Sequence, residues 1–368
     1  MTQPSQNRPD GDDLRDRIAL LREQQGRVTH DIQELTAELR KRPDSTDLYL
    51  EALSLLQPSQ MTQPDQTAVA RVLKRPLPHT DSFWVSLLER RRRKQLGFVP
   101  EKHLGVNKSK DLSFARALGI PTVTTRFTGA WEDIPRELTP GCIKPVSSSE
   151  SRGVFYILPD GVKSVRFSVE CVDWDEVERV AADQLGIHPG EVEWELQDLV
   201  TWRGNPGPDL KFYAFYGEIG AVVEVSRYKT PQYAYYDHDL ERVPFTGDSK
   251  PTMTDFTDSI IAAGLPEEEL DAVREFSKKI PVPYMRIDYL GSDDGLVFCE
   301  FSSAPGEAHM IDAENQERLG TMYHRAEMRL LHDLLNGKTF DGYMAHPVSS
   351  ELRAMRADDD EVDQPGRA

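Results

Sequence analysis

Hydrophobic and polar positions follow two different patterns along the chain. Up to about residue 105, apolar residues recur every three or four positions, as they do on helices, and from 106 to 340 helical segments alternate with strands. Residues 14–39 carry an apolar seam at heptad spacing, formed by Leu14, Ile18, Leu21, Val28, Ile32, Leu35 and Leu39, with Gln25 in its one gap. The seam predicts either a self-associating coiled coil or an amphipathic helix that packs on its own domain.

A helical connector is expected after this first helix, because prolines punctuate its short helical runs. A further helix over 82–96 contains the basic run Arg90–Lys94. This run fits a docking site for a polyanion or an acidic partner surface, and it also fits a solvated helix end that complements the helix dipole. We divide the chain into a coiled-coil helix (1–45), a helical connector (46–105), a mixed α/β domain (106–340) and an acidic tail expected to be disordered (341–368).

The stretch 284–306 predicts a β-hairpin with a polar face. Two apolar-rich runs, 285–290 and 296–301, flank a Gly-bounded connection, and pairing Leu290 with Leu296 fixes the register. One face then carries the core residues Met285, Ile287, Tyr289, Val297, Cys299 and Phe301. On the other face Arg286 lies opposite Glu300, with Asp288 on the diagonal. This set fits a surface salt bridge on a solvated face, and it also fits a Mg2+ site between two carboxylates.

Composition narrows the class of protein. A net charge of -18 over 368 residues argues against a general nucleic-acid or anionic-membrane binder, because both need clustered positive charge. The three cysteines, Cys142, Cys171 and Cys299, form no CxxC pair, which predicts buried free thiols in a reducing cytosol instead of a zinc or disulfide framework. The N-terminus has no apolar signal-peptide core, and no run of eighteen apolar residues occurs. We expect a cytoplasmic protein without a transmembrane segment.

Four basic residues lie on separate predicted elements of the mixed region: Lys108, Lys144, Lys211 and Arg286. A lysine within an apolar strand is unfavourable unless it has a partner. The strand ending at Lys144 leads into the Ser-rich turn 147–153, whose backbone N–H groups and hydroxyls could contact phosphate oxygens. Taken alone, the turn also fits an exposed polar loop.

The order of these motifs resembles the ATP-grasp superfamily. The relevant segments are Asn107-Lys108 with the helix that ends before Ile120-Pro121, Ile143-Lys144-Pro145 with the Ser-rich turn, WELQDLV at 194–200, Arg286-Ile287-Asp288, and EFSSAPG at 300–306. DLKFYAFYG at 209–217 and YYD at 235–237 are similar to the DYKFYCFNG and FYD stretches of TupA-like ATP-grasp proteins, which are the closest likeness. The likeness covers residues 107–306, and it departs from the common pattern at Gln197, where an acidic residue is usual, and at Ser302, where Asn is usual.

This resemblance implies a two-lobed α/β (α+β) ATP-grasp fold with an N-terminal helical or coiled-coil extension, and the cofactors ATP and Mg2+. It implies ATP binding by Lys108, Lys144, Ser147, Ser148, Ser149, Gly153, Gln197, Asp198, Val200 and Lys211. It implies metal binding by Asp288, Glu300 and Ser302, and catalytic roles for Arg286 and Lys211. We add Arg227 and Lys229, a basic pair after a predicted strand, as candidates for holding a substrate carboxylate.

The resemblance further implies a carboxylate-amine ligase that forms an acylphosphate from ATP and joins a small-molecule carboxylate to an amine. Likeness to the TupA-like proteins implies substrates related to cell-surface polymers, such as an amino acid joined to a uronic acid. Two alternatives remain open at this stage: a small-molecule kinase, which would use the same residues, and a non-catalytic ATP-binding scaffold that works through its coiled coil. A homo-oligomer formed through residues 14–39 is expected from the heptad seam.

Overall fold

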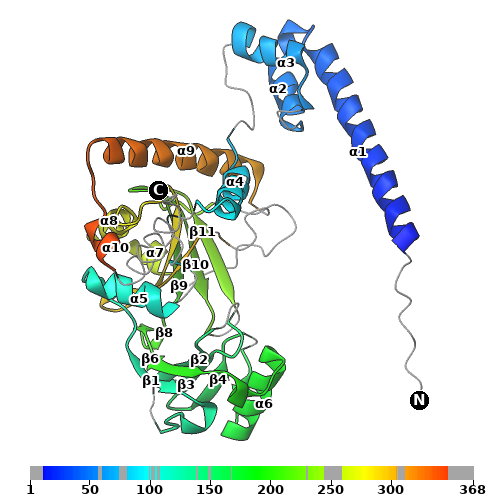
Figure 1. The fold of residues 1–368 in the computed structure, drawn as a ribbon. Helices are drawn as coiled ribbons and strands as arrows, with labels where there is room; N and C mark the ends of the chain where they lie inside the picture. Colours follow the sequence, from blue (N-terminus) through cyan, green and yellow to red (C-terminus); the bar gives the residue numbers. More distant parts are fainter. Residues whose placement is uncertain are drawn as a thin grey trace, which may run out of the picture. The chain divides into compact units, whose positions relative to one another are not determined.

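The structure is a computed structural model that separates into two compact units, Met1–Ser82 and Phe83–Ala368 (Figure 1). It describes residues 11–56, 60–73, 81–98, 100, 104–105, 108–137, 140–147, 151–166, 168–228, 231–243, 259–303, 305 and 311–346. Of the predicted acidic tail, everything beyond residue 346 therefore lies outside the described residues. No helix in the described residues is long and apolar enough to cross a membrane.

The first unit is helical, as its periodicity predicts. Its elements are α1 (Gly11–Leu39), the turn η1 (Pro43–Ser45), α2 (Thr46–Ser54), α3 (Gln63–Thr67) and the π-helical η3 (Ala68–Leu73). Its core consists of Tyr49, Leu53, Leu56, Met61 and Val69. Within the heptad seam of α1, Ile32 and Leu39 pack against this core, whereas Leu14, Ile18, Leu21, Val28 and Leu35 are exposed. The seam therefore packs against the core of its own unit only near the C-terminal end of α1.

One lobe of the second unit is built on a six-stranded antiparallel sheet in the order β1-β6-β2-β3-β4-β5 (Figure 1). The strands are β1 (Thr125–Gly129), β2 (Gly141–Pro145), β3 (Phe155–Leu158), β4 (Gly161–Ser164), β5 (Glu170–Cys171) and β6 (Trp194–Asp198). Helix α6 (Trp174–Leu185) packs beside β4 and β5, and the turns η4 (Trp131–Asp133) and η5 (Pro189–Glu191) adjoin each other. Trp194 and Leu196 lie at the centre of this lobe's core.

The other lobe contains a five-stranded antiparallel sheet in the order β11-β10-β9-β12-β13. Its strands are β9 (Asp209–Ala214), β10 (Ile219–Ser226), β11 (Gln232–Tyr236), β12 (Met285–Ser292) and β13 (Gly295–Ser302), and a short pair, β7 (Thr201–Trp202) and β8 (Asn205–Pro206), precedes them. The helices of this unit are α4 (Phe83–Gln95), α5 (Lys108–Ala117), α7 (Ile260–Gly264), α8 (Glu267–Ser277), α9 (Ala313–Leu335) and α10 (Asp341–Ala345). Of these, α5 packs on β13, α8 on β9 and β12, and α4 on α9.

The predicted fold class is confirmed: two sheets with accompanying helices follow an N-terminal helical unit. The expected strand 141–145 and helix 174–185 coincide with β2 and α6. The division at Ser82 places α4, with the basic run, in the second unit. The predicted boundaries at residues 45 and 105 stay predictions.

The predicted hairpin forms, but the predicted pairing of Leu290 with Leu296 is wrong. A two-residue turn at 293–294 pairs Leu290 with Val297, and a β-bulge between Asp288 and Tyr289 shifts the pairing again. Asp288 therefore lies opposite Glu300, and Arg286 lies opposite Ser302. Because the bulge reverses the alternation of side chains, Leu296 and Phe298 enter the core, Val297 is half-buried, and Cys299 faces a cavity.

Candidate functional site

A cavity of about 760 Å³ is lined by residues of both sheets in the second unit. Ten of the sequence-predicted site residues line it: Lys108, Lys144, Gln197, Asp198, Val200, Lys211, Arg227, Arg286, Glu300 and Ser302. Three others, Ser147, Gly153 and Asp288, are described but are not among the lining residues. The remaining predictions, Ser148, Ser149 and Lys229, lie outside the described residues. Segments that are far apart in the sequence thus converge on one site.

Asp288 is the centre of a buried charge cluster at the wall of this cavity. It is 3% exposed, and its carboxylate accepts hydrogen bonds from Arg286 Nε and Nη2, each at 2.7 Å, and from Lys211 Nζ at 3.0 Å. The cluster forms because β12 pairs with β9, which places Asp288 opposite Lys211. Burial alone would raise the pKa of Asp288, but Lys211 and Arg286 together lower it below its ordinary value.

Lys108 and Glu300 form an ion pair in the lining of the cavity. Lys108 is the first residue of α5, Glu300 lies on β13, and Lys108 Nζ is 3.0 Å from Glu300 Oε2. Both side chains keep part of their surface exposed, at 31% and 25%. If this ion pair opens, Lys108 can contact an anionic ligand and Glu300 can contact a cationic one.

Lys144 comes from the other lobe and is almost completely enclosed. It lies directly across from Glu195 on β6, and Lys144 Nζ is 3.4 Å from Glu195 Oε1. Burial would lower the pKa of Lys144, but its acidic neighbours, of which the Glu195 carboxylate is charged at pH 7, raise it above its ordinary value. Lys144 thus keeps its charge inside the cavity.

The cysteines are free thiols, as predicted, but two of them are not core residues. Cys142 and Cys299 are half-buried and line the cavity from opposite lobes. Burial raises the pKa of Cys142 to about 11 and that of Cys299 to about 12, so both thiols are neutral at pH 7. Cys171 alone is fully buried, in the core of the first lobe.

A cationic and aromatic region occupies another part of the wall. Arg227 Nε donates to Asp209 Oδ2 at 2.8 Å, and both side chains are about one quarter exposed. The cavity lining also includes Tyr156, Tyr213, Tyr233 and Tyr235, of which Tyr156 and Tyr233 interact electrostatically with Arg227. Arg227 was predicted from the sequence, but Asp209 and the tyrosines were not, because their convergence depends on the pairing of β9, β10 and β11 and on β3 of the other lobe, which carries Tyr156.

The segment expected to contact adenine follows β6 along the cavity. Gln197 is 3% exposed and its Nε2 is 3.4 Å from Thr125 Oγ1, while the Asp198 carboxylate pairs with Arg126 Nε at 2.8 Å. The backbone carbonyl of Val200 accepts from Gly207 N at 2.9 Å. The predicted lid residues are less central: Ser147 is exposed, and Gly153, at φ 71°, donates its N–H to Gln184.

Two residues that organise the site were missed from the sequence. Asp111, 1% exposed on α5, accepts from Gly105 N at 3.0 Å and from Phe301 N at 3.2 Å. Arg90 Nη1 donates to the carbonyls of Tyr284 and Ser303, so the first cation of the basic run fixes both ends of the β12–β13 hairpin. Neither role has a local sequence signal, because each depends on at least one contact between residues more than 180 positions apart.

The oxygen donors near the Lys108–Glu300 pair fit a hard divalent cation. Glu300 and Ser302 line the cavity on β13, and Asp288 lies opposite Glu300 on β12. Carboxylate and hydroxyl oxygens are the ligands that Mg2+ takes in proteins, usually with water and phosphate oxygens. Because Arg286 and Lys211 already occupy the Asp288 oxygens, Glu300 is the more accessible donor.

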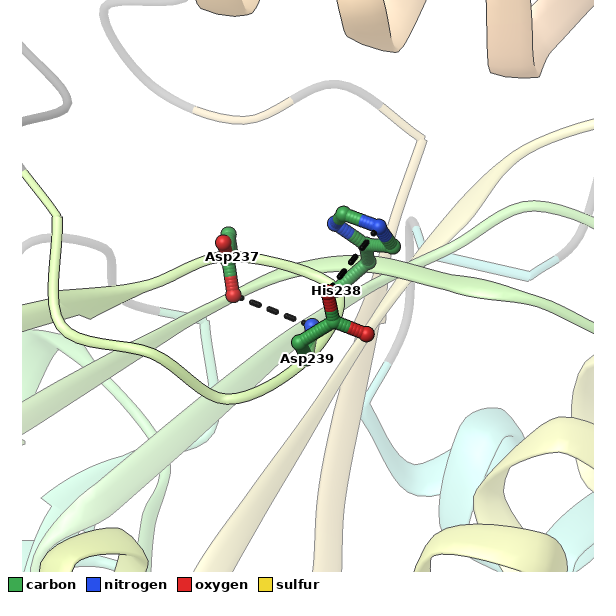
Figure 2. A group of neighbouring side chains, drawn as sticks. All are labelled: Asp237, His238 and Asp239. Carbon is green, nitrogen blue, oxygen red and sulfur yellow. Dashed lines mark hydrogen bonds and ion pairs between the residues drawn. The ribbon is translucent and has the colours of Figure 1, made fainter.

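A second acidic group lies at the end of β11 and is explained by its own loop. Asp237, His238 and Asp239 are consecutive, and Figure 2 shows Asp237 directed at the backbone of the same turn. Its Oδ1 accepts from the N–H groups of Asp239 and Glu241, at 3.0 and 2.9 Å, while His238 Nε2 is 3.4 Å from Asp239 Oδ2. We assign these residues a structural role in the turn.

The first unit has a cavity of about 710 Å³ that lacks comparable chemistry. Its lining combines apolar and neutral polar residues with Arg40 and Arg42, and it contains no acidic, histidine or cysteine side chain. The candidate site is therefore the cavity of the second unit.

Comparison with known proteins agrees with the resemblance to TupA-like ATP-grasp proteins found in the sequence. The TupA-like ATP-grasp family model matches residues 199–324, which confirms that resemblance over this segment. No curated protein matches the sequence. Among solved structures, the ATP-grasp ligase PsnB complexed with minimal precursor is 13% identical, with 61% of this chain and 60% of that chain aligned and a TM-score of 0.34. This chain thus spans less than two thirds of that ligase.

Two further structures are similar at the same level. PsnB complexed with minimal precursor, Mg and ADP is 14% identical, over 74% of this chain and 76% of that chain, with a TM-score of 0.37. The D-alanine–D-alanine ligase from Bacillus anthracis complexed with ATP is 12% identical, over 77% of this chain and 91% of that chain, with a TM-score of 0.40.

Proposed function

We propose that this protein is an ATP- and Mg2+-dependent carboxylate-amine ligase of the TupA-like ATP-grasp type. One observation carries the proposal: the two sheets and helix α5 place five cations around one cavity in a chain of net charge -18. The five are Lys108, Lys144, Lys211, Arg227 and Arg286. An acidic protein that gathers cations in a pocket is suited to an anionic ligand. The match of residues 199–324 to the TupA-like ATP-grasp family supports a nucleotide as that ligand.

In this proposal the nucleotide phosphates lie between the two lobes. Lys108, Lys144 and Lys211 contact phosphate oxygens, and Arg286, held by Asp288, faces the transferred phosphoryl group. Gln197 and the backbone of Asp198 and Val200 border the adenine. A fixed cation in a partly water-excluded cleft stabilises developing negative charge, and loss of one such donor lowers the rate roughly 10²-fold or more.

Glu300 and Ser302 would hold Mg2+, with Asp288 as a further donor, and the ion would supply charge neutralisation between the phosphates and the protein. PsnB has been solved with Mg and ADP, and the B. anthracis ligase with ATP. We propose the same kinds of cofactor for this chain.

The proposed reaction has two steps. An oxygen of the substrate carboxylate attacks the γ-phosphorus, ADP leaves, and an acylphosphate forms. The amine nitrogen then attacks the acyl carbon, inorganic phosphate leaves, and the amine loses a proton. We propose that Arg227, with Tyr156 and Tyr233 near it, holds a substrate carboxylate, and that the substrates are precursors of a cell-surface polysaccharide made in the cytoplasm.

Nucleotide binding, measured by calorimetry with and without Mg2+, tests this proposal. We expect Mg2+ to tighten ATP binding, and Glu300→Gln to abolish the effect of Mg2+. Glu218→Gln is the matched control, because Glu218 is paired with Arg329 at the same 3.0 Å distance but does not line the cavity. A wild-type protein that does not bind ATP at millimolar concentration refutes the proposal.

Substrate-dependent phosphate release then separates the candidate reactions. A ligase releases phosphate only when carboxylate and amine are both present, and the amide is detected by mass spectrometry. A phosphorylated product formed without an amine identifies a kinase instead, and ATP binding without turnover on any substrate identifies a scaffold.

We also propose that α1 associates with α1 of a second copy. Its seam residues at heptad spacing are exposed from Leu14 to Val28. The test is sedimentation of Leu21→Glu, because Leu21 lies on the seam and is 61% exposed; Leu20→Glu, at a 50% exposed position off the seam, is the control. A dimer lost only with Leu21→Glu supports the proposal, and a monomeric wild type at micromolar concentration refutes it.

A further inference from the structure

The buried carboxylate of Asp111 connects the two sides of the Lys108–Glu300 pair. Asp111 lies in the first turn of α5, three residues after Lys108. Its Oδ1 accepts the N–H of Gly105, in the turn just before α5, at 3.0 Å. Its Oδ2 accepts the N–H of Phe301, the residue that follows Glu300, at 3.2 Å. One side chain therefore joins the segments that carry the cation and the carboxylate.

The hydrogen bond from Phe301 to Asp111 also provides a partner for a backbone N–H group at the edge of the sheet. Strand β13 is an edge strand, so its outward N–H groups need partners from outside the sheet. Phe298 N donates to Pro121 O at 2.8 Å, and Phe301 N donates to Asp111. These two contacts lie on either side of Glu300, so the backbone that carries this carboxylate is held from α5 and from the segment after it.

The packing around Asp111 is tight on both sides. A Cβ placed on Gly105, at φ +74°, would lie 3.2 Å from Ser303 N and 3.3 Å from Phe301 O. Phe114 of α5 packs against Phe301, with ring centroids 6.2 Å apart. This packing therefore resists small displacements of α5 relative to β13. The hydrogen bonds of Asp111 determine where the helix contacts the strand.

The negative charge of Asp111 is unfavourable in the folded protein. Burial raises the pKa of Asp111 to about 7, although the two backbone N–H groups and Lys108 oppose the rise. A raised carboxyl pKa means that its charged form is less favourable in the folded protein than in the unfolded chain. What Asp111 contributes is therefore its pair of backbone hydrogen bonds, which join Gly105 to Phe301, and not its charge.

We propose that Asp111 is a positioning residue that fixes the spacing between the phosphate-binding Lys108 and the metal-binding Glu300. The inference rests on the proposed Mg2+-nucleotide site. Residues that orient a metal ligand through a hydrogen bond typically change metal affinity 10–100-fold when they are replaced. The measurable quantity is the factor by which Mg2+ tightens the binding of ADP.

The experiment compares Asp111→Asn with Glu224→Gln in the full chain by calorimetry. Glu224 is the matched control, because it is also buried, on β10, and accepts the N–H groups of Ile260 and Ile261, at 2.7 and 3.4 Å, yet it does not line the cavity. Asn keeps one acceptor but presents an NH2 group to the other N–H. We expect Asp111→Asn to reduce the Mg2+ factor about 10-fold or more, and Glu224→Gln to leave it unchanged while lowering Tm.

An unchanged Mg2+ factor in a folded Asp111→Asn protein overturns the inference, even if its Tm falls as much as that of Glu224→Gln. Should Asp111→Asn fail to fold, Asp111→Glu gives the same comparison, because it keeps the charge and both acceptors but moves them by one methylene group. A wild-type protein whose ADP affinity does not respond to Mg2+ instead refutes the proposed function on which the inference rests.

Discussion

Replacing Asp288 with Asn should destabilise the second unit strongly. Asp288 accepts three charged hydrogen bonds, two from Arg286 and one from Lys211, and only 4% of its side chain is exposed. Asn has nearly the same shape but carries no charge and has one acceptor oxygen fewer. The substitution therefore removes the carboxylate that contacts both enclosed cations, and of the two only Lys211 keeps a second anionic neighbour, Asp209.

The expected magnitude follows from the burial of the cluster. Removing one partner of a buried ion pair reduces the free energy of unfolding by about 3–5 kcal/mol, because the remaining charge is left uncompensated. Asp209→Asn is the control. The Asp209–Arg227 pair has side chains about one quarter exposed and joined by a single 2.8 Å hydrogen bond, so we expect a loss of about 1–2 kcal/mol.

Tryptophan fluorescence during urea unfolding measures both variants cleanly. All five tryptophans, Trp84, Trp131, Trp174, Trp194 and Trp202, lie in the second unit, so the signal does not mix the two units. The reasoning is refuted if Asp288→Asn loses no more stability than Asp209→Asn.

The pH dependence gives a second check on the same cluster. Lys211 and Arg286 depress the folded-state pKa of Asp288, so its contribution to stability is complete above its unfolded pKa of about 4. That contribution is lost as the pH falls through the depressed folded value, because the protonated side chain is neutral, like Asn. The stability difference between wild type and Asp288→Asn should therefore be constant from pH 5 to 8 and shrink below pH 4. A difference that is equally large at low pH would contradict this assignment of the charge.

Two further predictions concern the cavity and the hairpin. At pH 8.5, iodoacetamide should react with Cys142 about two orders of magnitude, and with Cys299 about three orders of magnitude, more slowly than with free cysteine, because few thiolates form at their raised pKa. ATP with Mg2+ should slow them further without affecting Cys171, as measured by peptide mass spectrometry, and equal rates with and without nucleotide would argue against nucleotide in this cavity. Arg90→Ala should lower the free energy of unfolding by about 2–3 kcal/mol, because two hairpin carbonyls lose a charged donor. The control is Arg92→Ala, at an exposed neighbouring position, which should change this free energy by less than about 0.5 kcal/mol. Urea unfolding measures both variants.

The sequence located most elements of the second unit because each has a local signal. Helix α6 has an Asp N-cap and a Gly C-cap in the left-handed region, and the predicted range 174–185 matches it. Short strands such as β4 and β5, and the short helix α7, were missed, because four or fewer extended residues, or one helical turn, produce no clear period.

The register of the β12–β13 hairpin was not predictable from alternation alone. Sequence alternation assumes that every residue of one strand has one partner, and a bulge breaks this rule without a glycine to mark it. Gly291 has a different role: a Cβ there would approach within 2.0 Å of Ile260 Cδ1, so α7 can lie against the strand only at a glycine. That requirement comes from tertiary packing, and α7 follows a segment with no strong pattern.

The site itself was predicted as a set of cations, but their partners were not. Lys108, Lys144, Lys211 and Arg286 stand out in the sequence because charge within an apolar segment needs an explanation. Glu195, Asp209 and Asp111 do not stand out, because acidic residues are abundant in this chain. Only the pairing of β2 with β6, and the packing of α5 on β13, shows which carboxylates matter.

Because the cations of the cavity are already paired with carboxylates, an anionic ligand must compete with these carboxylates. Its lining has five cationic side chains and three carboxylates, and Lys108, Lys144, Lys211 and Arg286 each have a carboxylate within 3.4 Å. An anion that binds there must replace carboxylates as partners of the lysines, and a released carboxylate is then left without its cation. At the Lys108–Glu300 pair, an anionic phosphate and a divalent cation together satisfy both side chains, whereas either one alone leaves one side chain uncompensated. The pairing therefore favours joint binding of nucleotide and metal, and it makes the spacing set by Asp111 matter to both.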